Sequence, residues 1–140
     1  MKRRQFLLSS PLLLSSTIYA LEQSANYKVA VIGHTGRGDY GHGLDYIWNS
    51  IDTTKIIAVA DASEKGLEKA KKKLKIENGF TDYRKMLEVT KPDIVAVCPR
   101  HADQHADMIK AAILNGAKAV YTEKPFCRSP LEADQISILA

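Results

Sequence analysis

The feature that most constrains the fold of this chain is a series of short apolar runs, each followed by an amphipathic segment. Each run is continuously apolar rather than alternating, which is typical of parallel strands covered on both faces. The runs are KVAVIG (28–33), KIIAVAD (55–61), DIVAVCP (93–99) and KAVYTE (118–123). With a weaker strand near 79–81, they predict an α/β fold, a doubly wound parallel sheet in the order 3-2-1-4-5 with right-handed crossovers.

The segments between the runs place apolar residues at helical spacing. The glycine-rich turn before the first of these segments predicts that its helix begins late. The apolar stripes are Leu44–Ile47–Trp48–Ile51, Leu67–Ala70–Leu74, Tyr83–Met86–Leu87–Thr90 and Ala102–Ala106–Ile109–Ile113.

A fifth helix is predicted from the segment SPLE, near the end of the chain. Ser129 is its expected N-cap and Pro130 its first residue, and Glu132 is expected to close a capping box. Gly116 is expected to end the helix before it. The 140 residues stop within this fifth helix, so we expect a domain that is truncated there.

The N-terminal 20 residues read as an export signal, which leaves a domain over residues 21–140. They combine a basic start, an apolar stretch over 6–14 and a small residue at Ala20. The pair Arg3–Arg4, followed by Gln-Phe-Leu, resembles the bacterial twin-arginine signal, with an ordinary secretory signal as the alternative. The apolar stretch is too short for a stable membrane span. We therefore predict a periplasmic protein.

Charge argues against a nucleic-acid partner. The formal net charge is +4, but the first 20 residues carry three basic side chains and no acid, which leaves 17 basic against 16 acidic residues. No basic face is expected on such a domain. The four histidines are scattered, which predicts no metal site. Cys98 and Cys127 are expected to be unlinked thiols.

Five of the eight glycines lie within residues 33–43, directly after the first apolar run. A glycine-rich turn between a first strand and a first helix is the phosphate site of a dinucleotide-binding Rossmann fold, because it exposes backbone N–H groups at a helix N-terminus. Two registers fit: GRGDYG (36–41) matches G-x-G-x-x-G literally, whereas GHTGRG (33–38) begins where the strand ends. We choose the second register. The predicted cofactor-binding residues are Gly33, Thr35, Gly36, Arg37 and Gly38.

Asp61, at the end of the second run, is the predicted partner of the adenosine ribose. A carboxylate there accepts hydrogen bonds from the ribose hydroxyls and repels a 2′-phosphate, which favours NAD over NADP. Arg37 would soften that preference if it turned toward the ribose. The alternative for Asp61 is a helix N-cap.

Several segments together resemble the Gfo/Idh/MocA family, the relatives of glucose–fructose oxidoreductase and inositol dehydrogenase. They are VAVIGHTGRG, VAVAD, DYRKML, KPDIVAVCP, His105 and YTEKPF, in the family's order. The similarity runs from about Tyr27 to the end of the chain. It implies a Rossmann domain and hydride transfer between NAD(P) and a hydroxyl carbon of a sugar or polyol. It also implies a second, C-terminal α/β domain, which these 140 residues do not contain.

The resemblance assigns roles to residues near the ends of the later strands. It implies that Lys124 is catalytic and lies beside the nicotinamide and the substrate hydroxyl. Glu123 and Pro125 would shape that turn around a cis Lys–Pro bond, and Pro99 would lie on the nicotinamide side. His105 is the second catalytic candidate, with a purely structural role as the alternative.

The leading hypothesis is the cofactor-binding part of an exported NAD-dependent oxidoreductase. Its sugar or polyol substrate would be held by the missing domain, so the 140 residues alone would bind a dinucleotide and catalyse little or nothing. The alternatives are an NAD-dependent glycoside hydrolase of the same family and a non-catalytic NAD-binding module. The resemblance leaves a homo-oligomer open.

Overall fold

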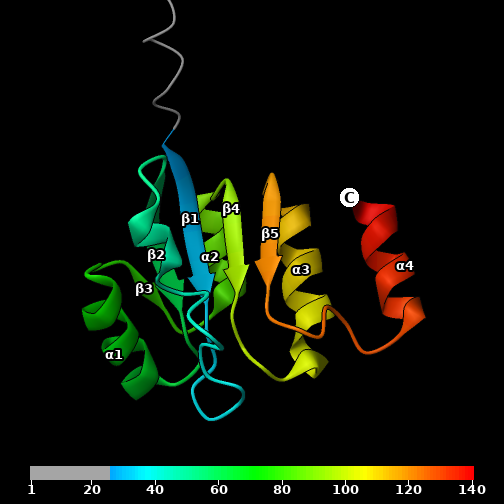
Figure 1. Cartoon of the computed structure of the whole chain (residues 1–140), viewed down its shortest axis with the longest axis horizontal. Coiled ribbons are helices and arrows are strands. Elements are labelled where there is room, and N and C mark those ends of the chain that lie inside the picture. Colours follow the sequence, from blue (N-terminus) through cyan, green and yellow to red (C-terminus); the bar gives the residue numbers. More distant parts are fainter. Residues whose placement is uncertain (1–25) are drawn as a thin grey trace, which may run out of the picture.

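Five parallel strands form one sheet in the order β3-β2-β1-β4-β5, as predicted (Figure 1). The structure is a computed structural model that describes residues 26–140, so the predicted export signal lies outside the described residues. The strands are β1 (Tyr27–Ile32), β2 (Thr54–Ala60), β3 (Gly79–Phe80), β4 (Ile94–Val97) and β5 (Ala119–Thr122).

The central strands are apolar throughout because both of their faces are covered. In β1, Ala30 and Ile32 belong to one hydrophobic cluster, while Val29 and Val31 belong to the cluster on the opposite face. All four are at most 1% exposed. Successive strand residues point to opposite faces, so a strand with two buried faces has no place for a polar residue.

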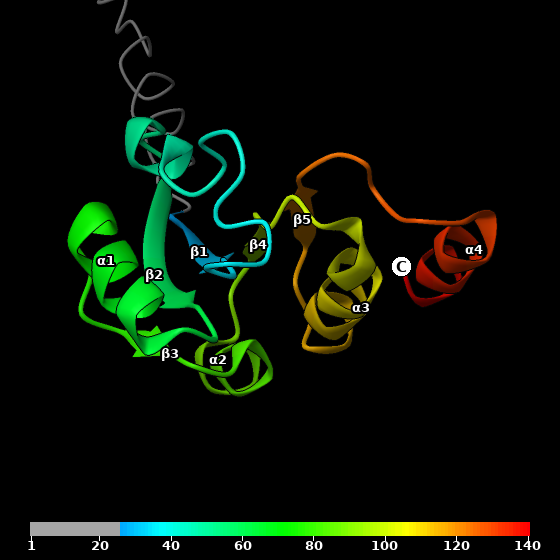
Figure 2. The ribbon, with the colours of Figure 1, turned by 90° about the horizontal axis from the view of Figure 1, so that it is seen from below.

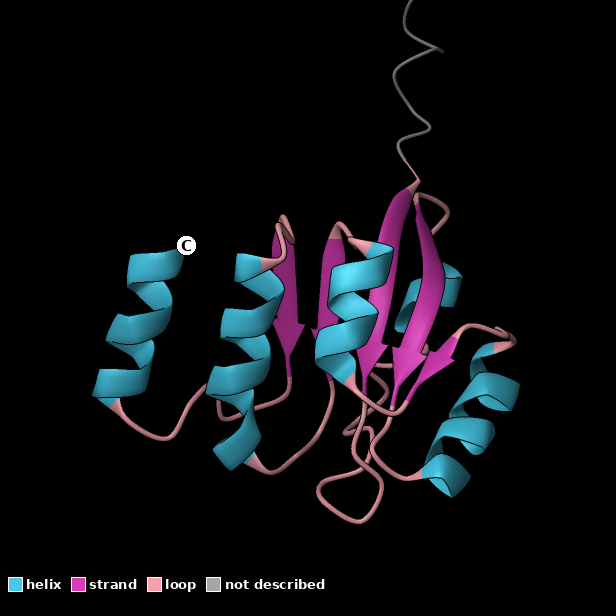
Figure 3. Ribbon diagram, turned by 180° about the vertical axis from the view of Figure 1, so that it is seen from behind, coloured by secondary structure: helices cyan, strands magenta, loops and turns pink. Residues whose placement is uncertain are grey.

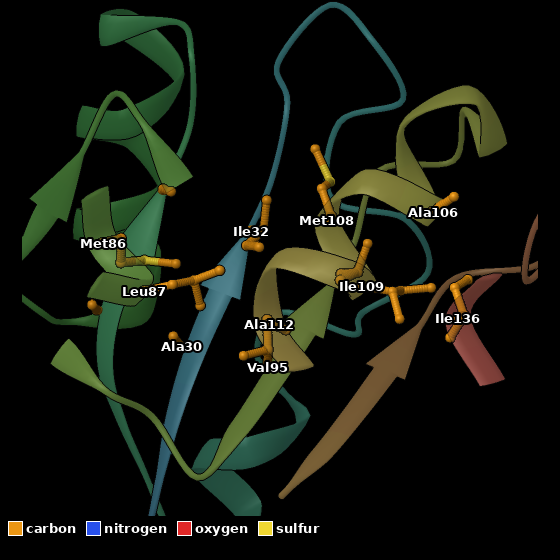
Figure 4. Packing of buried hydrophobic residues seen from close by; sticks show 13 residues of the cluster. Ala30, Ile32, Met86, Leu87, Val95, Ala106, Met108, Ile109, Ala112 and Ile136 are labelled. Atoms are coloured by element: carbon orange, nitrogen blue, oxygen red, sulfur yellow. The ribbon is translucent and has the colours of Figure 1, made fainter. Parts of the chain in front are cut away.

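Helices cover both faces of the sheet. The described helices are α1 (Glu64–Leu74), α2 (Tyr83–Thr90), α3 (His105–Leu114) and α4 (Pro130–Leu139), with the 3₁₀ turns η1 (Ile47–Ser50) and η2 (Ala102–Gln104). Figure 2 shows η1 on the side of the sheet opposite to α2 and α3, and Figure 3 shows α2 and α3 in front of the strands. α4 lies beside α3, and Ile136 of α4 joins the cluster of α2 and α3 (Figure 4).

The helix ends in the structure match those predicted from the sequence, with one difference. Ser129 Oγ accepts a hydrogen bond from the Glu132 backbone N–H at 3.3 Å, and Pro130 is the first residue of α4. The expected capping box is displaced by one residue, because Glu132 Oε2 accepts from the backbone N–H of Arg128, not of Ser129. Gly116, with a φ of +85°, follows the end of α3.

The first helix, predicted from the stripe Leu44–Ile47–Trp48–Ile51, begins late as predicted but is shorter than that stripe. Only the 3₁₀ turn η1 forms there, and irregular turns lead into it. Gly41 and Gly43 have φ values of +59° and +91°, which a right-handed helix cannot contain. The chain from 33 to 46, called the glycine loop below, therefore takes the place of a first helix.

The predictions about membrane spans, metal sites and cysteines can be compared with the structure only for residues 26–140. In that part of the chain no helix is long and apolar enough to cross a membrane. Neither is there a cluster of three or more metal-ligating side chains between those residues. Cys98 is buried, Cys127 is half-buried, and the two thiols are not bonded, as predicted.

Candidate functional site

Three turns meet at the edge of the sheet where the strands end. They are the glycine loop after β1, the turn over 98–104 after β4, and the turn over 123–128 after β5. Figure 1 shows the glycine loop (cyan) extending beyond this edge. Ligands of open parallel sheets bind at this edge, because the loops that connect the strands to the helices diverge there.

The first half of the glycine loop folds into a tight turn. His34 and Asp39 form an antiparallel bridge, in which the N–H groups of His34 and Asp39 each donate to the other residue's carbonyl, at 3.1 and 2.9 Å. The turn needs left-handed backbone at Gly36 (φ +82°) and Gly38 (φ +95°), and Asp39 also has a positive φ of +52°. Gly36 donates its N–H to Asp39 Oδ1 at 3.1 Å. The glycines thus serve the turn's own geometry.

Asp61 lies directly after β2, where the sequence predicts a ribose partner, and the glycine loop surrounds its carboxylate. The Thr35 hydroxyl donates to Oδ2 at 2.6 Å and the Thr35 N–H to Oδ1 at 3.1 Å. Tyr40 donates its hydroxyl to Oδ2 at 2.8 Å. Asp61 is only 1% exposed. It is not the N-cap of α1, because Ser63 has that position and donates its own N–H to Asp61 Oδ1 at 2.9 Å.

Tyr40 is a functional candidate that the sequence reasoning missed. Its ring lies against Gly33, where an added Cβ would come within 2.2 Å of the ring atoms Cε1 and Cζ. Burial, together with the hydrogen bond to Asp61, raises the pKa of the Tyr40 phenol far above its usual range, so the hydroxyl remains a donor. The one signal in the sequence is an aromatic residue among the glycines of DYGHG, which a loop exposed to water does not need.

The glycine loop is also fastened to the turn after β4. The backbone N–H of Arg100 donates to the Gly38 carbonyl at 3.0 Å, and Gln104 Nε2 donates to the Arg37 carbonyl at 3.1 Å. The Arg37 guanidinium forms an ion pair with Asp103. Arg37 therefore points toward the turn after β4, not toward Asp61. A Cβ on Gly38 would meet the Arg100 backbone N at 2.4 Å, so only glycine allows this approach.

The Glu-Lys-Pro turn after β5 contacts the far end of the glycine loop. Glu123 is 4% exposed and accepts from the His42 N–H at 3.1 Å and from the Lys124 N–H at 3.0 Å. Burial raises the pKa of Glu123, but the hydrogen bonds from His42 and Lys124 outweigh it and hold the pKa below its usual value. Lys124 is exposed, and its peptide bond to Pro125 is cis. The lysine is thus free at the sheet edge while the glutamate holds the loop.

His105 is fully buried and joins two of the turns. Its Nε2 lies 2.6 Å from the Pro99 carbonyl oxygen and its Nδ1 lies 2.8 Å from the Pro125 carbonyl oxygen. A carbonyl only accepts, so the ring donates to one turn when neutral and to both when protonated. These contacts give His105 a positioning role between Pro99 and Pro125. The catalytic role suggested by the resemblance remains a prediction.

A pocket of about 240 Å³ opens beside the ends of β1 and β2. Its walls include Gly33 and Asp61 from the predicted set, and they also include residues for which the sequence predicted no role in cofactor binding. These are His34, Ala60, Ala62, Thr81, Asp82, Tyr83, Arg84, Gln104 and Met108. The pocket is of a size for one part of a dinucleotide, next to the carboxylate expected to meet its ribose. The residues present therefore fit the adenosine part of NAD(P).

This fold and this edge define a dinucleotide-binding α/β domain. Residues 27–140 match the model of a family described as "Oxidoreductase family, NAD-binding Rossmann fold". The chain therefore belongs to the Gfo/Idh/MocA family, as the sequence motifs implied. A search of curated proteins found no match.

Solved structures agree with this fold. A probable dehydrogenase from Thermotoga maritima is 25% identical, with a TM-score of 0.67 over 80% of this chain and 32% of that one. The apo scyllo-inositol dehydrogenase from Lactobacillus casei is 23% identical (TM-score 0.67; 83% and 33% covered). KijD10, a 3-ketoreductase from Actinomadura kijaniata in complex with TDP-benzene and NADP, is also 23% identical (TM-score 0.68; 82% and 35%). The chain spans about a third of the length of these structures.

Proposed function

We propose that this chain binds a nicotinamide dinucleotide at the carboxyl edge of its sheet, as the cofactor part of an oxidoreductase acting on a sugar or polyol hydroxyl carbon. The observation that carries the proposal is the convergence of Asp61, the glycine loop and the Glu123–Pro125 turn on that one edge. The solved relatives support the substrate class, since one is a scyllo-inositol dehydrogenase and another a 3-ketoreductase.

The bound dinucleotide would accept or deliver a hydride, and the residues of this chain would position it. Asp61 would accept from the ribose hydroxyls, and Gly33 would allow close approach at the end of β1. Lys124, exposed after β5, would donate a hydrogen bond to the reacting hydroxyl and stabilise negative charge developing on its oxygen. His105 would keep the Pro99 and Pro125 turns in register below it.

Calorimetry on the full chain with NAD⁺, NADH, NADP⁺ and NADPH tests the binding proposal. We expect binding, with the forms that lack the 2′-phosphate preferred, because the Asp61 carboxylate repels that group. Asp61→Asn keeps the shape and removes the charge, so it should reduce the preference. Glu64→Gln, an exposed carboxylate in the first turn of α1, is the matched control. A folded chain that binds none of the four nucleotides would contradict the proposal.

Export to the periplasm is a separate proposal, supported by the Arg3–Arg4 pair and the apolar stretch behind it. The test is the location of the chain when it is expressed in a bacterium with an active twin-arginine pathway. Changing both arginines to lysine preserves the charge and should leave the chain in the cytoplasm. Export that is equally efficient with two lysines would refute the twin-arginine assignment.

A further inference from the structure

We infer that the glycine loop is a self-closing latch: Thr35, Asp39 and Tyr40 occupy the positions that a dinucleotide would use, so the loop must open before the dinucleotide binds. The inference rests on the proposed function, because it concerns the same site. The term latch below means residues 33–43 in the conformation described here.

The first step concerns the backbone donors of the latch. A glycine-rich turn binds a diphosphate through free N–H groups. In this structure the N–H groups of Thr35 and Gly36 already donate to the carboxylates of Asp61 and Asp39, and that of Gly33 donates to the Ala60 carbonyl at 2.9 Å. Two carboxylates of the protein thus take the place of phosphate oxygens.

The second step concerns Asp61, the expected hydrogen-bond acceptor for the ribose. A ribose would offer two hydroxyl groups to Asp61. The latch offers two as well, from Thr35 at 2.6 Å and from Tyr40 at 2.8 Å. Asp61 is buried, so a ribose can reach its oxygens only if those two hydroxyls move away.

The third step is steric. The Tyr40 ring lies against Gly33, the residue at which the backbone is expected to come closest to the diphosphate. The pocket of about 240 Å³ borders Gly33 and Asp61 but is not lined by Tyr40. The adenine part of the site is therefore open in the closed latch, whereas the neighbouring part at the Asp61 oxygens holds Thr35 and Tyr40.

The fourth step is what holds the latch. Arg37 pairs with Asp103, and the Gly38 carbonyl accepts from the Arg100 N–H, so the tip of the latch is tied to the turn after β4. The Arg37 and Asp103 side chains are 52% and 36% exposed, which makes this tie weak and sensitive to salt. The hydrogen bonds to the buried Asp61 carboxylate hold the latch more strongly than this ion pair does.

Tyr40→Phe tests the inference, because it removes one hydroxyl and keeps the ring. The matched control is Tyr46→Phe, the same change on a half-exposed tyrosine of the same loop. NADH binding is measured by calorimetry on the full chain, and opening of the latch by hydrogen exchange at the Thr35 amide. We expect Tyr40→Phe to bind NADH about tenfold more tightly, since a hydrogen bond to a carboxylate no longer opposes opening. The Thr35 amide should also exchange faster, and Tyr46→Phe should change neither.

NADH binding by the wild-type chain tests the proposed function, whereas the difference between wild type and Tyr40→Phe tests the latch. If the wild-type chain binds NADH and Tyr40→Phe binds it no more tightly, the latch is refuted while the binding site stands. Unchanged exchange at the Thr35 amide would also refute the latch. If neither folded protein binds NADH, both proposals fail together.

Discussion

Replacing Gly33 with alanine should open the closed loop by steric overlap alone. The φ of Gly33 is not in the left-handed region, so the backbone itself accepts an L-residue. The new Cβ, however, would lie 2.2 Å from two atoms of the Tyr40 ring, where ordinary contacts begin near 3.4 Å. The ring must therefore retreat by more than an ångström, which removes its hydroxyl from Asp61.

The cost has two parts. Losing a hydrogen bond to a charged group costs about 1.5–3 kcal/mol. Forcing a packed side chain to move adds about 1–3 kcal/mol. We therefore expect Gly33→Ala to lower the free energy of unfolding by about 2.5–6 kcal/mol. The assay is denaturant unfolding followed by the fluorescence of Trp48, the only tryptophan, which is 9% exposed.

Two comparisons make the result decisive. Gly36→Ala meets no atom within 4 Å but has a φ of +82°, so it should cost only about 1–2 kcal/mol of backbone strain. In a Tyr40→Ala background, Gly33→Ala should be nearly neutral, because the ring it strikes is gone. An equal cost of Gly33→Ala in both backgrounds would refute the contact between Gly33 and Tyr40.

Three other predictions concern the rest of the domain. The hydrogen bonds from the Lys118 side chain and from the Lys28 N–H lower the pKa of Asp93. The ionised Asp93 therefore stabilises the fold at neutral pH, and this stabilisation is lost as the pH falls through the folded-state pKa. Asp93→Asn should flatten the acid side of a curve of stability against pH. Burial raises the pKa of the Cys98 thiol, so in the native protein an alkylating reagent counted by mass spectrometry should modify Cys127 first and Cys98 only after unfolding. His105→Ala should cost about 2–5 kcal/mol in denaturant unfolding, because it leaves a cavity and removes the ring nitrogens that contact the Pro99 and Pro125 carbonyls.

The sheet could be predicted from sequence because a strand that is buried on both faces needs an uninterrupted run of apolar residues. Every residue from Val29 to Ile32 is apolar, and each is covered by one cluster or the other. The weak strand predicted near 79–81 is also present as the two-residue strand β3, which pairs with the end of β2 at Val59 and Ala60. The short length of the first helix was not predicted, because the apolar spacing from Leu44 to Ile51 does not show that Gly41 and Gly43 before it have positive φ values.

The site was predictable in its placement but not in its contacts. Topology brings Asp61 and Glu123 to one edge, since parallel strands end on the same side. That Tyr40 would donate to Asp61, 21 residues further along the chain, depends on the path of the glycine loop that contains Tyr40. The spacing of apolar residues predicts regular helices and strands, so it gives no information about the path of an irregular loop.

The buried carboxylates explain how an irregular, glycine-rich loop holds one conformation. Asp61 and Glu123 are each less than 5% exposed, and an unpaired charge so placed would cost several kcal/mol. The loop supplies their donors from Thr35, Tyr40 and His42, so loop and strand ends stabilise each other. Any ligand that replaces the loop at Asp61 must bring hydroxyl donors of its own. An adenosine ribose with two free hydroxyls meets that condition, whereas a 2′-phosphate offers only acceptors, so we propose that the closed loop itself selects against NADP.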